Sequence, residues 1–401
     1  MGKSAIIIGA GVVGVSSAYA LARRGWRVTL VDRANGPAME TSHANGAQLS
    51  YCYTDALGSP ATVAALPRIF AGKGGVSFRL SGGSDYLRWL AQFALNCTRS
   101  KFRKNTLEVL DLAKQSSRAM DDLRKRHELS FDHRVAGKIH LLYSDKDHKQ
   151  AKSLQAFKRD AGYEQFILDR QELTQLDPAL STLDVGVIGA ISTPSEIVAD
   201  PLLFSQELLN ILTREYPVDV HFGREVTRVD EVKGRAEVTL DNGEVHNAGI
   251  AIVAAATDSN RLLRPHGHAV PVQPMKGYSF EMPLTEGSPR ISVTDGKRRL
   301  VMTRLGGRIR VAGIAELGNA CRAIDQQRIE WLINAARECL PSAGDYDKAG
   351  KFWAGLRPAT PNSQPIIRRA SKALAINTGH GALGWTLAMG SGERIADILS
   401  D

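Results

Sequence analysis

Short apolar runs and longer amphipathic stretches alternate along the first part of the chain. Residues 5–8 are all apolar, a pattern typical of a parallel strand that is buried on both faces. A largely apolar stretch over 13–24 predicts a helix, Gly25 ends it, and residues 26–32 predict a second strand. The chain therefore begins with strand, tight turn, helix and strand in succession.

The later pattern predicts a second unit. Asp200 followed by Pro201 is a typical helix start, and Asn242-Gly243 is a typical hairpin turn. Strands and helices in one mixed order favour an α/β fold whose second part is a mixed or antiparallel sheet with helices on one face. The elements expected after the first unit are a helical stretch over 84–130, a strand near 138–143, a helix from 201, strands within 220–232 and 235–256, and strands between 271 and 316.

The first turn carries a nucleotide-binding motif. Gly9, Gly11 and Gly14 form G-x-G-x-x-G directly after the first strand. In such a turn the first glycine permits the sharp bend, the second lets backbone N–H groups approach a pyrophosphate, and the third lets helix and strand pack closely. The anion then lies at the helix N-terminus, near Val12 and Val13, where unpaired N–H groups and the dipole favour it.

An acidic residue completes this motif. Asp32 ends the second predicted strand, where a carboxylate accepts hydrogen bonds from ribose hydroxyls. Arg33 follows it and does not by itself separate FAD from NAD. The uncharged stretch 4–22 after Lys3 also has features of a secretory signal peptide, but its glycines fit a nucleotide-binding turn better.

Charge and composition narrow the class of protein. The 401 residues carry a formal net charge of +9 and are 43% hydrophobic, as in an ordinary globular protein. Basic residues are scattered and no nucleic-acid-binding motif accompanies them, so we expect no nucleic-acid partner. A peripheral contact with an anionic membrane surface stays open, as does a homo- or hetero-oligomer.

The cysteines and histidines predict neither disulfides nor a metal site. Four cysteines, Cys52, Cys97, Cys321 and Cys339, have no paired or ligand-like spacing, and ten histidines form no HExxH-like pattern. No second apolar run is long enough to span a bilayer. We therefore expect a reduced, cytoplasmic protein, with the cytoplasmic face of the inner membrane as the alternative location.

Several further stretches carry a family resemblance. They are "ETSHANGAQLSY" (40–51), "PVQPMKGYSFEM" (271–282), "RLGGRIRVAGIAE" (304–316), "FWAGLRPATPNSQPII" (352–367) and "NTGHGALGWTLAMGSG" (377–392). Together with the first turn, they resemble the FAD-dependent oxidoreductases of the D-amino-acid oxidase type, and within them the bacterial D-amino-acid dehydrogenases. This chain departs from the family pattern at two places. It has Asn45-Gly46-Ala47 where such proteins usually have Asn-Ala-Gly or Asn-Gly-Gly, and Asn362-Ser363 where they usually have Asp-Gly.

The resemblance implies a fold and a cofactor. The fold is a Rossmann-like FAD-binding domain (1–50, 196–265 and 360–401) interleaved with a substrate domain of mixed or antiparallel sheet plus helices (51–195 and 266–359). The FAD is expected to be non-covalent, because no cysteine lies where the family attaches it. The implied cofactor-binding residues are Gly9, Gly11, Val12, Val13, Gly14, Asp32, Arg33, Thr41, Ser42, Asn45, Gly46, Ala47, Gln48, Leu49, Ala255, Gly379, His380, Gly381, Leu383, Gly384, Trp385 and Thr386.

The resemblance also implies a carboxylate site. Arg357 in "GLRPAT" is the residue that would hold a substrate carboxylate, which suits the two parallel donors of a guanidinium. Tyr278 and Arg310 are weaker catalytic candidates, with Lys276 and Arg304 behind them. Arg308, Arg310 and Ala312 share one face of their strand, but the pattern does not show which face meets the flavin.

The expected activity is the oxidative deamination of D-amino acids to 2-oxo acids and ammonia, with electrons passed to a quinone or another carrier. Three alternatives remain at this point. One is the oxidation of secondary amino acids such as proline-like acids, opines, sarcosine or glycine. The second is a flavoprotein subunit that is active only in a hetero-oligomer. The third is an NAD-dependent dehydrogenase, which has no use for the 40–51 loop or the C-terminal glycine stretch.

Overall fold

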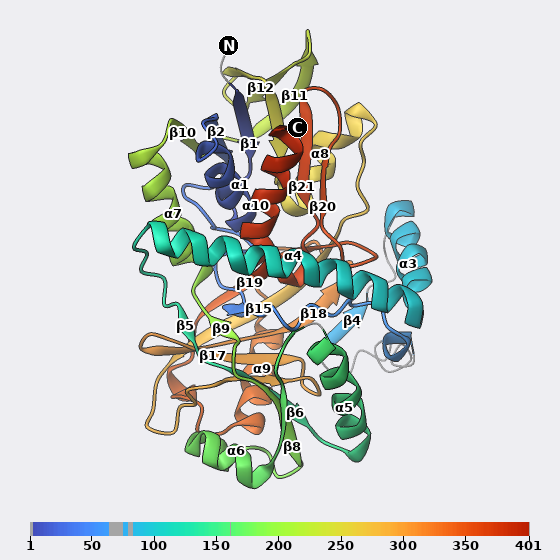
Figure 1. The fold of residues 1–401 in the computed structure, drawn as a ribbon, viewed down its shortest axis with the longest axis vertical. Coiled ribbons are helices and arrows are strands. Elements are labelled where there is room, and N and C mark those ends of the chain that lie inside the picture. Colours follow the sequence, from blue (N-terminus) through green and yellow to red (C-terminus); the bar gives the residue numbers. More distant parts are fainter. Residues whose placement is uncertain (1–2, 64–74, 79–82, 161, 401) are drawn as a thin grey trace.

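Two β-sheets organise the computed structural model, which describes residues 3–63, 75–78, 83–160 and 162–400. A six-stranded sheet lies near both termini, a nine-stranded sheet lies toward the opposite end, and one long helix crosses the front of the molecule (Figure 1). The chain passes between the two sheets several times, so segments from both chain ends meet segments from the middle.

The six-stranded sheet builds the nucleotide-binding half. Its buried first strand is flanked by parallel neighbours, as the apolar run over 5–8 predicts, and only the last strand is antiparallel. In spatial order its strands are β10 (Val218–Phe222), β2 (Arg27–Asp32), β1 (Ser4–Ile8), β14 (Ile250–Val253), β21 (Leu374–Thr378) and β20 (Ile366–Arg369).

The nine-stranded sheet is mixed, as the sequence predicts for the second unit. Its path is β19 (Gly350–Ala359), β15 (Gln273–Pro283), β18 (Arg308–Leu317), β17 (Leu300–Leu305), β16 (Ser292–Asp295), β6 (Lys138–Leu142), β8 (Gly189–Thr193) and β7 (Phe166–Asp169), with β4 (Val76–Phe78) beside β18. One face packs on α9 (Gln326–Cys339) in a hydrophobic core. The opposite face looks toward the nucleotide-binding half.

Two three-stranded sheets complete the strands. One is β11 (Val226–Val232), β12 (Arg235–Leu240) and β13 (Val245–Ala248), joined by the predicted turn at Asn242-Gly243, where Gly243 has φ +83. The other is β3 (Gln48–Leu49), β9 (Ile197–Val198) and β5 (Arg134–Val135), which connects the halves.

The helices lie outside these sheets. Asp200 caps the predicted helix by accepting a hydrogen bond from the Leu202 N–H. The α-helices are α1 (Val12–Ala22), α3 (Ser84–Asn96), α4 (Arg99–Arg126), α5 (Asp145–Asp160), α6 (Arg170–Leu176), α7 (Pro201–Glu215), α8 (Ser259–Leu263), α9 and α10 (Gly384–Ser400). Short 3₁₀ turns lie at Pro178–Thr182, Ala256–Asp258, Arg264–His266, Tyr346–Lys348 and Gly381–Leu383.

The predicted helical stretch over 84–130 is two helices. Thr98 breaks it, because its hydroxyl accepts a hydrogen bond from the Lys101 N–H and begins α4. The sequence assigns this range to the substrate-binding unit, yet α4 packs its apolar face into the core of the six-stranded sheet, against α10. The long helix therefore connects both halves (Figure 1).

Two C-terminal glycines serve this packing. A Cβ at Gly390 would lie 2.7 Å from the Leu112 carbonyl oxygen of α4, and one at Gly392 would lie 2.5 Å from the Ser16 carbonyl oxygen of α1. Both distances are far below van der Waals contact. These two glycines let three helices approach closely, and they do not belong to the cofactor contact that the sequence suggests.

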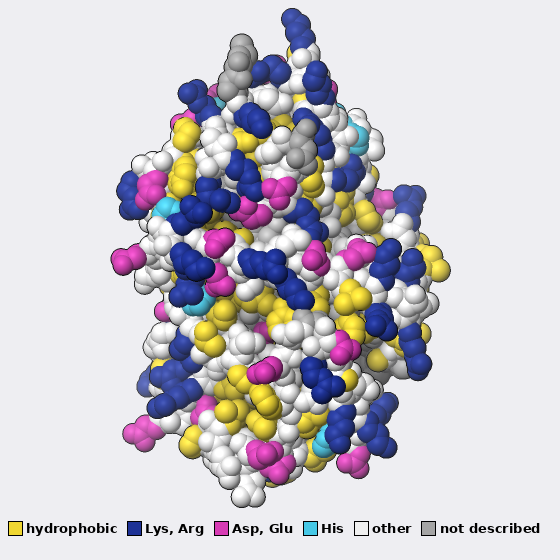
Figure 2. Space-filling view, in the orientation of Figure 1, with side chains coloured by type: hydrophobic (Ala, Val, Ile, Leu, Met, Phe, Trp, Pro, Cys, Tyr) yellow, Lys and Arg dark blue, Asp and Glu magenta, His cyan; other side chains and the backbone are white. Residues whose placement is uncertain are grey.

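The face of the molecule seen in Figure 2 has no single basic patch. Lysine and arginine side chains are spread over the visible face with acidic side chains between them (Figure 2). Within the described residues, no helix combines the length and the apolar character needed to cross a bilayer.

Candidate cofactor and substrate site

The three motif glycines have different reasons to be glycine. Gly9 has φ +108, and a Cβ there would lie 2.6 Å from the Ala254 carbonyl oxygen. A Cβ at Gly14 would lie 1.8 Å from the Gly9 carbonyl oxygen. Gly11 has an ordinary φ of −64, and the nearest atom to its Cβ would be Ser42 Oγ at 3.5 Å. The chain itself thus requires the first and third glycines, whereas only a ligand requires the second.

The helix α1 N-terminus faces this gap. Gly11 is its cap and offers no side-chain hydrogen bond, and the Val12 N–H reaches Ser42 Oγ at 3.2 Å. Val13 is the next residue of α1. Backbone N–H groups at such an N-terminus favour a phosphate.

Asp32 is held at the end of β2 by backbone groups. Its Oδ2 accepts from the Ala10 N–H at 2.6 Å, and its Oδ1 accepts from the Ala34 N–H at 2.8 Å. Burial raises the pKa of this carboxyl, although both hydrogen bonds act in the opposite direction. A carboxylate accepts about four hydrogen bonds, so capacity remains for ribose hydroxyls.

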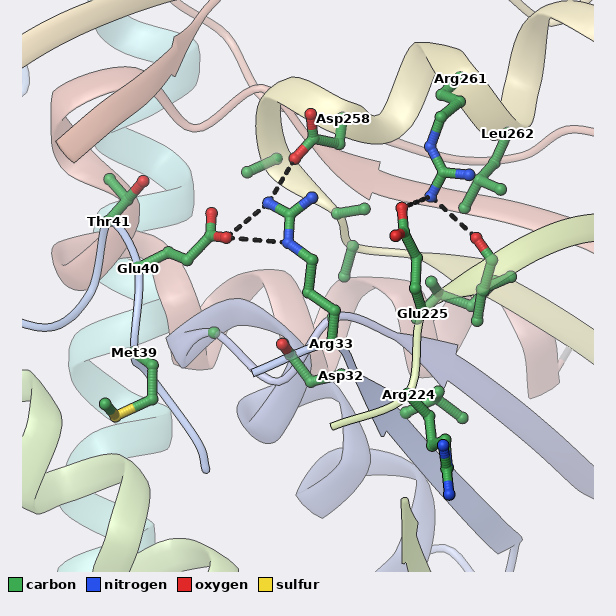
Figure 3. A pocket seen from close by; sticks show the side chains of 18 of the residues that line it. Asp32, Arg33, Met39, Glu40, Thr41, Arg224, Glu225, Asp258, Arg261 and Leu262 are labelled. Atoms are coloured by element: carbon green, nitrogen blue, oxygen red, sulfur yellow. Dashed lines mark hydrogen bonds and ion pairs between the residues drawn. The ribbon is translucent and has the colours of Figure 1, made fainter. Parts of the chain in front are cut away.

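A pocket connects these groups. It is lined by Gly9, Gly11, Asp32, Arg33, Thr41, Ser42 and Ala255 of the predicted cofactor set. The remaining lining residues are Ile8, Val31, Met39, Glu40, Arg224–Val226, Ala254, Ala256, Asp258, Arg261 and Leu262 (Figure 3). The residues that the sequence placed on a nucleotide therefore come together at the carboxyl ends of β1, β2 and β14.

Four charged residues form an ion-pair ring at this pocket. Arg33 Nη2 lies 2.5 Å from Glu40 Oε1 and 2.7 Å from Asp258 Oδ2, so its guanidinium lies between two carboxylates (Figure 3). Arg322 pairs with the same two carboxylates, at 2.7 Å from Asp258 Oδ2. Arg322 follows β18 of the other sheet, so the ring joins both halves of the molecule at the pocket.

Residues 45–49 of the predicted loop over 40–51 lie against the nine-stranded sheet. Asn45 Oδ1 accepts from the Ala47 N–H at 2.9 Å, and Ala47 has φ +53. A Cβ at Gly46 would lie 3.0 Å from Val301 on the face that looks toward the nucleotide-binding half. Gln48 donates to Ser292 Oγ, whereas Leu49 is fully buried in the core of the six-stranded sheet. The loop therefore runs along the junction of the two halves.

Unpartnered polar atoms mark the same junction. His43 Nδ1, Thr294 Oγ1 and Arg310 Nη1 are buried and have no hydrogen-bond partner within the described residues. Buried polar groups in native proteins are nearly always paired, so a polar ligand along this face would satisfy them.

The C-terminal glycine segment meets this loop. Thr386 Oγ1 accepts from the Ser50 N–H at 3.1 Å, which joins the two chain ends as expected. Gly379 has φ +80, and its Cβ would lie 2.7 Å from Thr360 Cγ2. Gly381 has φ +54 and faces open space, whereas a Cβ at Gly384 would make only an ordinary contact.

Three side chains of this segment are held by other protein groups. Trp385 donates from Nε1 to the Ala199 carbonyl at 3.1 Å and packs in the core, and Leu383 packs against the same core. His380 Nε2 lies 2.7 Å from Ser391 Oγ, fully buried. Any contact of these residues with a cofactor is therefore through backbone alone, as the sequence suggests for His380.

His380 makes folding sensitive to acid. Burial lowers the pKa of its imidazole to about 3, so the folded protein keeps it neutral while the unfolded chain protonates it below about pH 6.5. We expect the free energy of unfolding to fall by about 1.4 kcal/mol per pH unit from this residue between pH 6.5 and pH 4. Denaturant titrations at several pH values give the free energy of unfolding as a function of pH. For His380→Gln this free energy should fall by about 1.4 kcal/mol less per pH unit than for the unchanged protein. An equal pH dependence of the two proteins would contradict the buried neutral state.

Arg357 occupies the face of the nine-stranded sheet that looks toward the nucleotide-binding half. It lies on β19 beside Met275 of β15, and its Nη1 donates to the Ile314 carbonyl at 2.9 Å. No carboxylate within the described residues lies at ion-pair distance from it. Burial lowers the pKa of its guanidinium to about 10, which leaves it protonated at neutral pH. A half-buried arginine without an acidic partner is suited to bind a carboxylate ligand.

Two residues place this arginine. Ile314 has φ +62, a strained conformation for a β-branched residue, and this turns its carbonyl oxygen to the guanidinium. It lies where the pairing of β15 and β18 shifts register between Lys276 and Tyr278. At Gly277 a Cβ would lie 2.2 Å from Arg357 Nη2, so the absence of a side chain there leaves room for the guanidinium.

We expect Gly277→Ala to displace Arg357 without unfolding the protein, because the clashing atoms are the end of a flexible side chain. The KM of an amino-acid substrate should rise by about tenfold or more, which corresponds to losing one charge-assisted hydrogen bond. The matched control is Gly350→Ala on β19, where a Cβ meets nothing within 4 Å. Equal KM values for the two variants, measured at full FAD content, would contradict this role for Gly277.

The other catalytic candidates lie elsewhere. Tyr278 belongs to the opposite face of β15, in the core with α9, and donates to Glu316 Oε2 at 3.1 Å. Arg310 is on the cofactor-facing side but is ion-paired with Glu281 at 2.7 Å and Asp200 at 2.9 Å. The structure therefore does not bring either next to Arg357: Tyr278 packs within the substrate-side half, and Arg310 links the two halves through Asp200.

The weaker candidates are also apart from Arg357. Lys276 is buried and its Nζ donates to the Ala323 carbonyl. Arg304 lines a separate pocket with Arg134 and Arg290.

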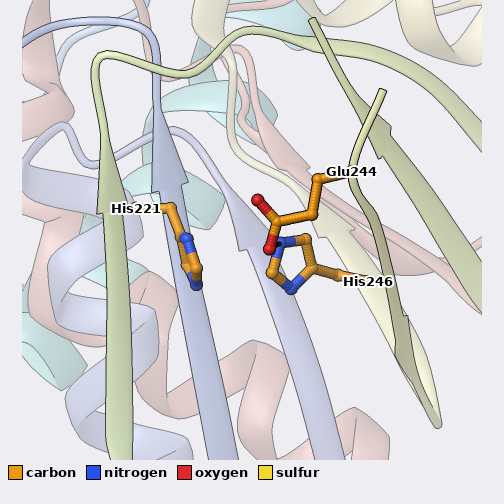
Figure 4. A group of neighbouring side chains, drawn as sticks. All are labelled: His221, Glu244 and His246. Atoms are coloured by element: carbon orange, nitrogen blue, oxygen red, sulfur yellow. Dashed lines mark ion pairs between the residues drawn. The ribbon is translucent and has the colours of Figure 1, made fainter. Parts of the chain in front are cut away.

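A group of possible metal ligands lies outside this site. The ligand atoms of His221, Glu244 and His246 all lie within 4.8 Å of one another (Figure 4). The sequence showed no metal pattern because His221 is on β10 and the other two are at β13. The group is partly exposed, and none of the three lines the nucleotide pocket.

The residues at the junction fit FAD. The glycine turn, the α1 N-terminus and Asp32 suit the nucleotide portion, and Gly11 has the space that only a ligand would fill. The unpartnered polar atoms and the open space at Gly381 suit the other part of FAD, the flavin ring and its ribityl chain.

Solved structures share this fold. Glycine oxidase from Geobacillus kaustophilus aligns with a TM-score of 0.76 at 18% identity, over 99% of this chain and 95% of that one. L-proline dehydrogenase from P. horikoshii aligns with a TM-score of 0.72 at 18% identity, over 100% and 93%. Iminodiacetate oxidase from Chelativorans sp. BNC1 aligns with a TM-score of 0.72 at 21% identity, over 99% and 95%.

The family follows from the sequence match. The model of the family described as FAD dependent oxidoreductase (DAO) matches residues 4–398, which is nearly the whole chain. This match agrees with the nucleotide pocket and with the arrangement of the two halves. The chain therefore belongs to the DAO family of FAD-dependent oxidoreductases.

Proposed function

We propose that this enzyme oxidises D-amino acids to 2-oxo acids and ammonia and passes the electrons to a quinone or another carrier. Arg357 is the observation that carries the proposal. It is a half-buried guanidinium without an acidic partner within the described residues, on the sheet face that meets the predicted flavin loop. The sequence resemblance to D-amino-acid dehydrogenases supports the choice of D-amino acids.

Arg357 would hold the α-carboxylate of the substrate through two parallel N–H donors, which fixes the orientation of Cα as well as the charge. The Ile314 carbonyl keeps Nη1 in place, so Nη2 and Nε remain for the ligand. The N-terminus of α10 begins at Gly384 without an acidic residue in its first turn, so its dipole favours negative charge on the cofactor side.

The reaction needs no nucleophile from the protein. FAD, when bound, supplies the redox chemistry by accepting the hydrogen that leaves Cα with its electron pair. The substrate nitrogen loses one proton, the Cα–N bond becomes a double bond, and water then converts the imino acid into the 2-oxo acid and ammonia. An acid–base pair next to Arg357 is not required if the amine binds in its neutral form.

The test is a substrate panel on the FAD-loaded enzyme without oxygen. We expect D-amino acids to remove the visible absorbance of the flavin, while L-amino acids leave it. Reduction by L-amino acids alone, by N-alkyl amino acids alone, or by none of the compounds would overturn the proposal. The yield of hydrogen peroxide in air then shows whether oxygen or another carrier takes the electrons.

A further inference from the structure

A large cavity, lined in part by Met275, the strand neighbour of Arg357, lies outside the nucleotide pocket. Its volume is about 1290 Å³, above the range of about 300–1,000 Å³ that is usual for small-molecule sites. Its apolar floor includes Trp89 and Phe93 of α3, Phe102 of α4, Phe157 of α5, and Met275 and Leu317 of the nine-stranded sheet. A free α-amino acid would fill only a small part of it.

The cavity adjoins the arginine through the sheet. Met275 lines the cavity and is the direct strand neighbour of Arg357, so both side chains stand on the same face. Ala315 also lines it and follows Ile314, whose carbonyl holds Arg357. The Trp89 indole donates to the Ala359 carbonyl at 3.0 Å, two residues beyond Arg357. Residues adjacent to Arg357 on the same sheet therefore line the cavity or bond to its aromatic floor.

Positive charge dominates the walls of this cavity. Five cationic residues line it, namely Arg99, Arg103, Lys146, Lys149 and Arg299, and none has an ion-pair partner within the described residues. The acidic lining residue, Asp55, is paired with the buried Lys158 at 3.1 Å. Low-dielectric walls with charge of one sign concentrate ligands of the opposite sign.

We propose that the substrate is an amino acid with a large apolar or aromatic body that ends in a second anionic group. This inference rests on the proposed function. Arg357 takes the α-carboxylate, the aromatic floor takes the body, and the cations at the wall take the far anionic end. A neutral apolar ligand would leave the five cations unexplained, and a small amino acid would leave the aromatic floor unexplained.

The first experiment compares two substrates that differ only in charge. 4-Carboxy-D-phenylalanine and 4-carbamoyl-D-phenylalanine have nearly the same shape, but only the first carries a second carboxylate. We expect kcat/KM to be about tenfold or more higher for the carboxylate at low ionic strength, as charge steering allows. The ratio of the two kcat/KM values should fall toward one at about 0.5 M NaCl, where the Debye length is about 4 Å.

The variants identify the cations that are responsible. The double variant Arg103→Gln, Lys149→Gln should lose most of the preference, whereas the control Lys101→Gln, an exposed lysine of α4 outside the cavity lining, should keep it. All three side chains are exposed, so we expect equal melting temperatures. Equal kcat/KM for the two substrates, or a preference that survives the double variant, would overturn the inference.

A binding experiment separates this inference from the proposed function. 3-(4-Carboxyphenyl)propanoate and 3-(4-carbamoylphenyl)propanoate lack the amine and cannot be oxidised to an imine, so calorimetry reports their binding alone. We expect the dianion to bind about tenfold or more tightly to the FAD-loaded enzyme, and the double variant to lose this difference. If the dianion is preferred but no amino acid reduces the flavin, the proposed oxidation is wrong and the cavity assignment stands. If neither compound is preferred, the cavity assignment is wrong whatever the activity.

Discussion

Replacing Arg357 with lysine is expected to raise the KM of an amino-acid substrate by about 10- to 100-fold while FAD stays bound. The guanidinium offers two parallel donors, whereas an ammonium is a point charge and cannot bind a carboxylate in the same bidentate way. One hydrogen bond to a charged group contributes about 1.5–3 kcal/mol, and about 1.4 kcal/mol corresponds to a factor of ten. Steady-state kinetics with the flavin spectrum as the measure of FAD content tests this expectation.

Arg304→Lys is the matched control for this variant. It makes the same chemical change on the same sheet, at an arginine that lines a different pocket. Its KM should equal that of the unchanged enzyme. If Arg357→Lys also leaves KM unchanged, the carboxylate must bind elsewhere, and the proposed orientation of the substrate is wrong.

Gly11→Val is expected to produce folded protein that purifies without FAD. The conformation at Gly11 is available to any residue, and the nearest protein atom to a Cβ is Ser42 Oγ at 3.5 Å. The added side chain would occupy the space over the α1 N-terminus that we assign to the pyrophosphate. We expect FAD affinity to fall by about 100-fold or more, since phosphate contacts are lost and steric overlap is added. The ratio of visible to protein absorbance measures this loss.

Gly14→Ala distinguishes the two roles of glycine in the motif. A Cβ there would lie 1.8 Å from the Gly9 carbonyl oxygen, so this variant should lose its cooperative melting transition rather than its ligand alone. Gly11→Ala, a smaller change, should keep the melting transition of the FAD-free protein. A fully yellow Gly11→Val enzyme would contradict the assignment of the turn to FAD.

Local patterns predicted the nucleotide-binding half well. The strand at 4–8, helix α1, the strand ending at Asp32 and the helix beginning at Pro201 all depend on residues close in sequence. The convergence of the two chain ends could be inferred only through the family resemblance, because Ser50 and Thr386 are 336 residues apart. Within that segment the glycines could not be divided between a ligand and helix packing, since Leu112 and Ser16 contact them from distant helices.

The substrate side was harder to predict because its partners are distant and its strands are irregular. Arg310 could not be recognised as a structural residue, because the sequence does not show that it pairs with Glu281 and Asp200. Tyr278 became a candidate through the family resemblance of residues 271–282, and the sequence does not show that its side chain packs against α9. Gly277 did carry a usable indication, since an isolated glycine within a strand often marks a close approach of another group. Nothing in the sequence indicated that Arg322 reaches Glu40 and Asp258.

The ion-pair ring also bears on how the holoenzyme assembles. Arg33, Glu40 and Asp258 belong to the nucleotide-binding half, whereas Arg322 arrives with the end of β18 and needs the nine-stranded sheet to be in place. The ring is therefore complete only when both halves are packed together. Because its four side chains are partly exposed, we expect high ionic strength to weaken it and to speed the release of FAD.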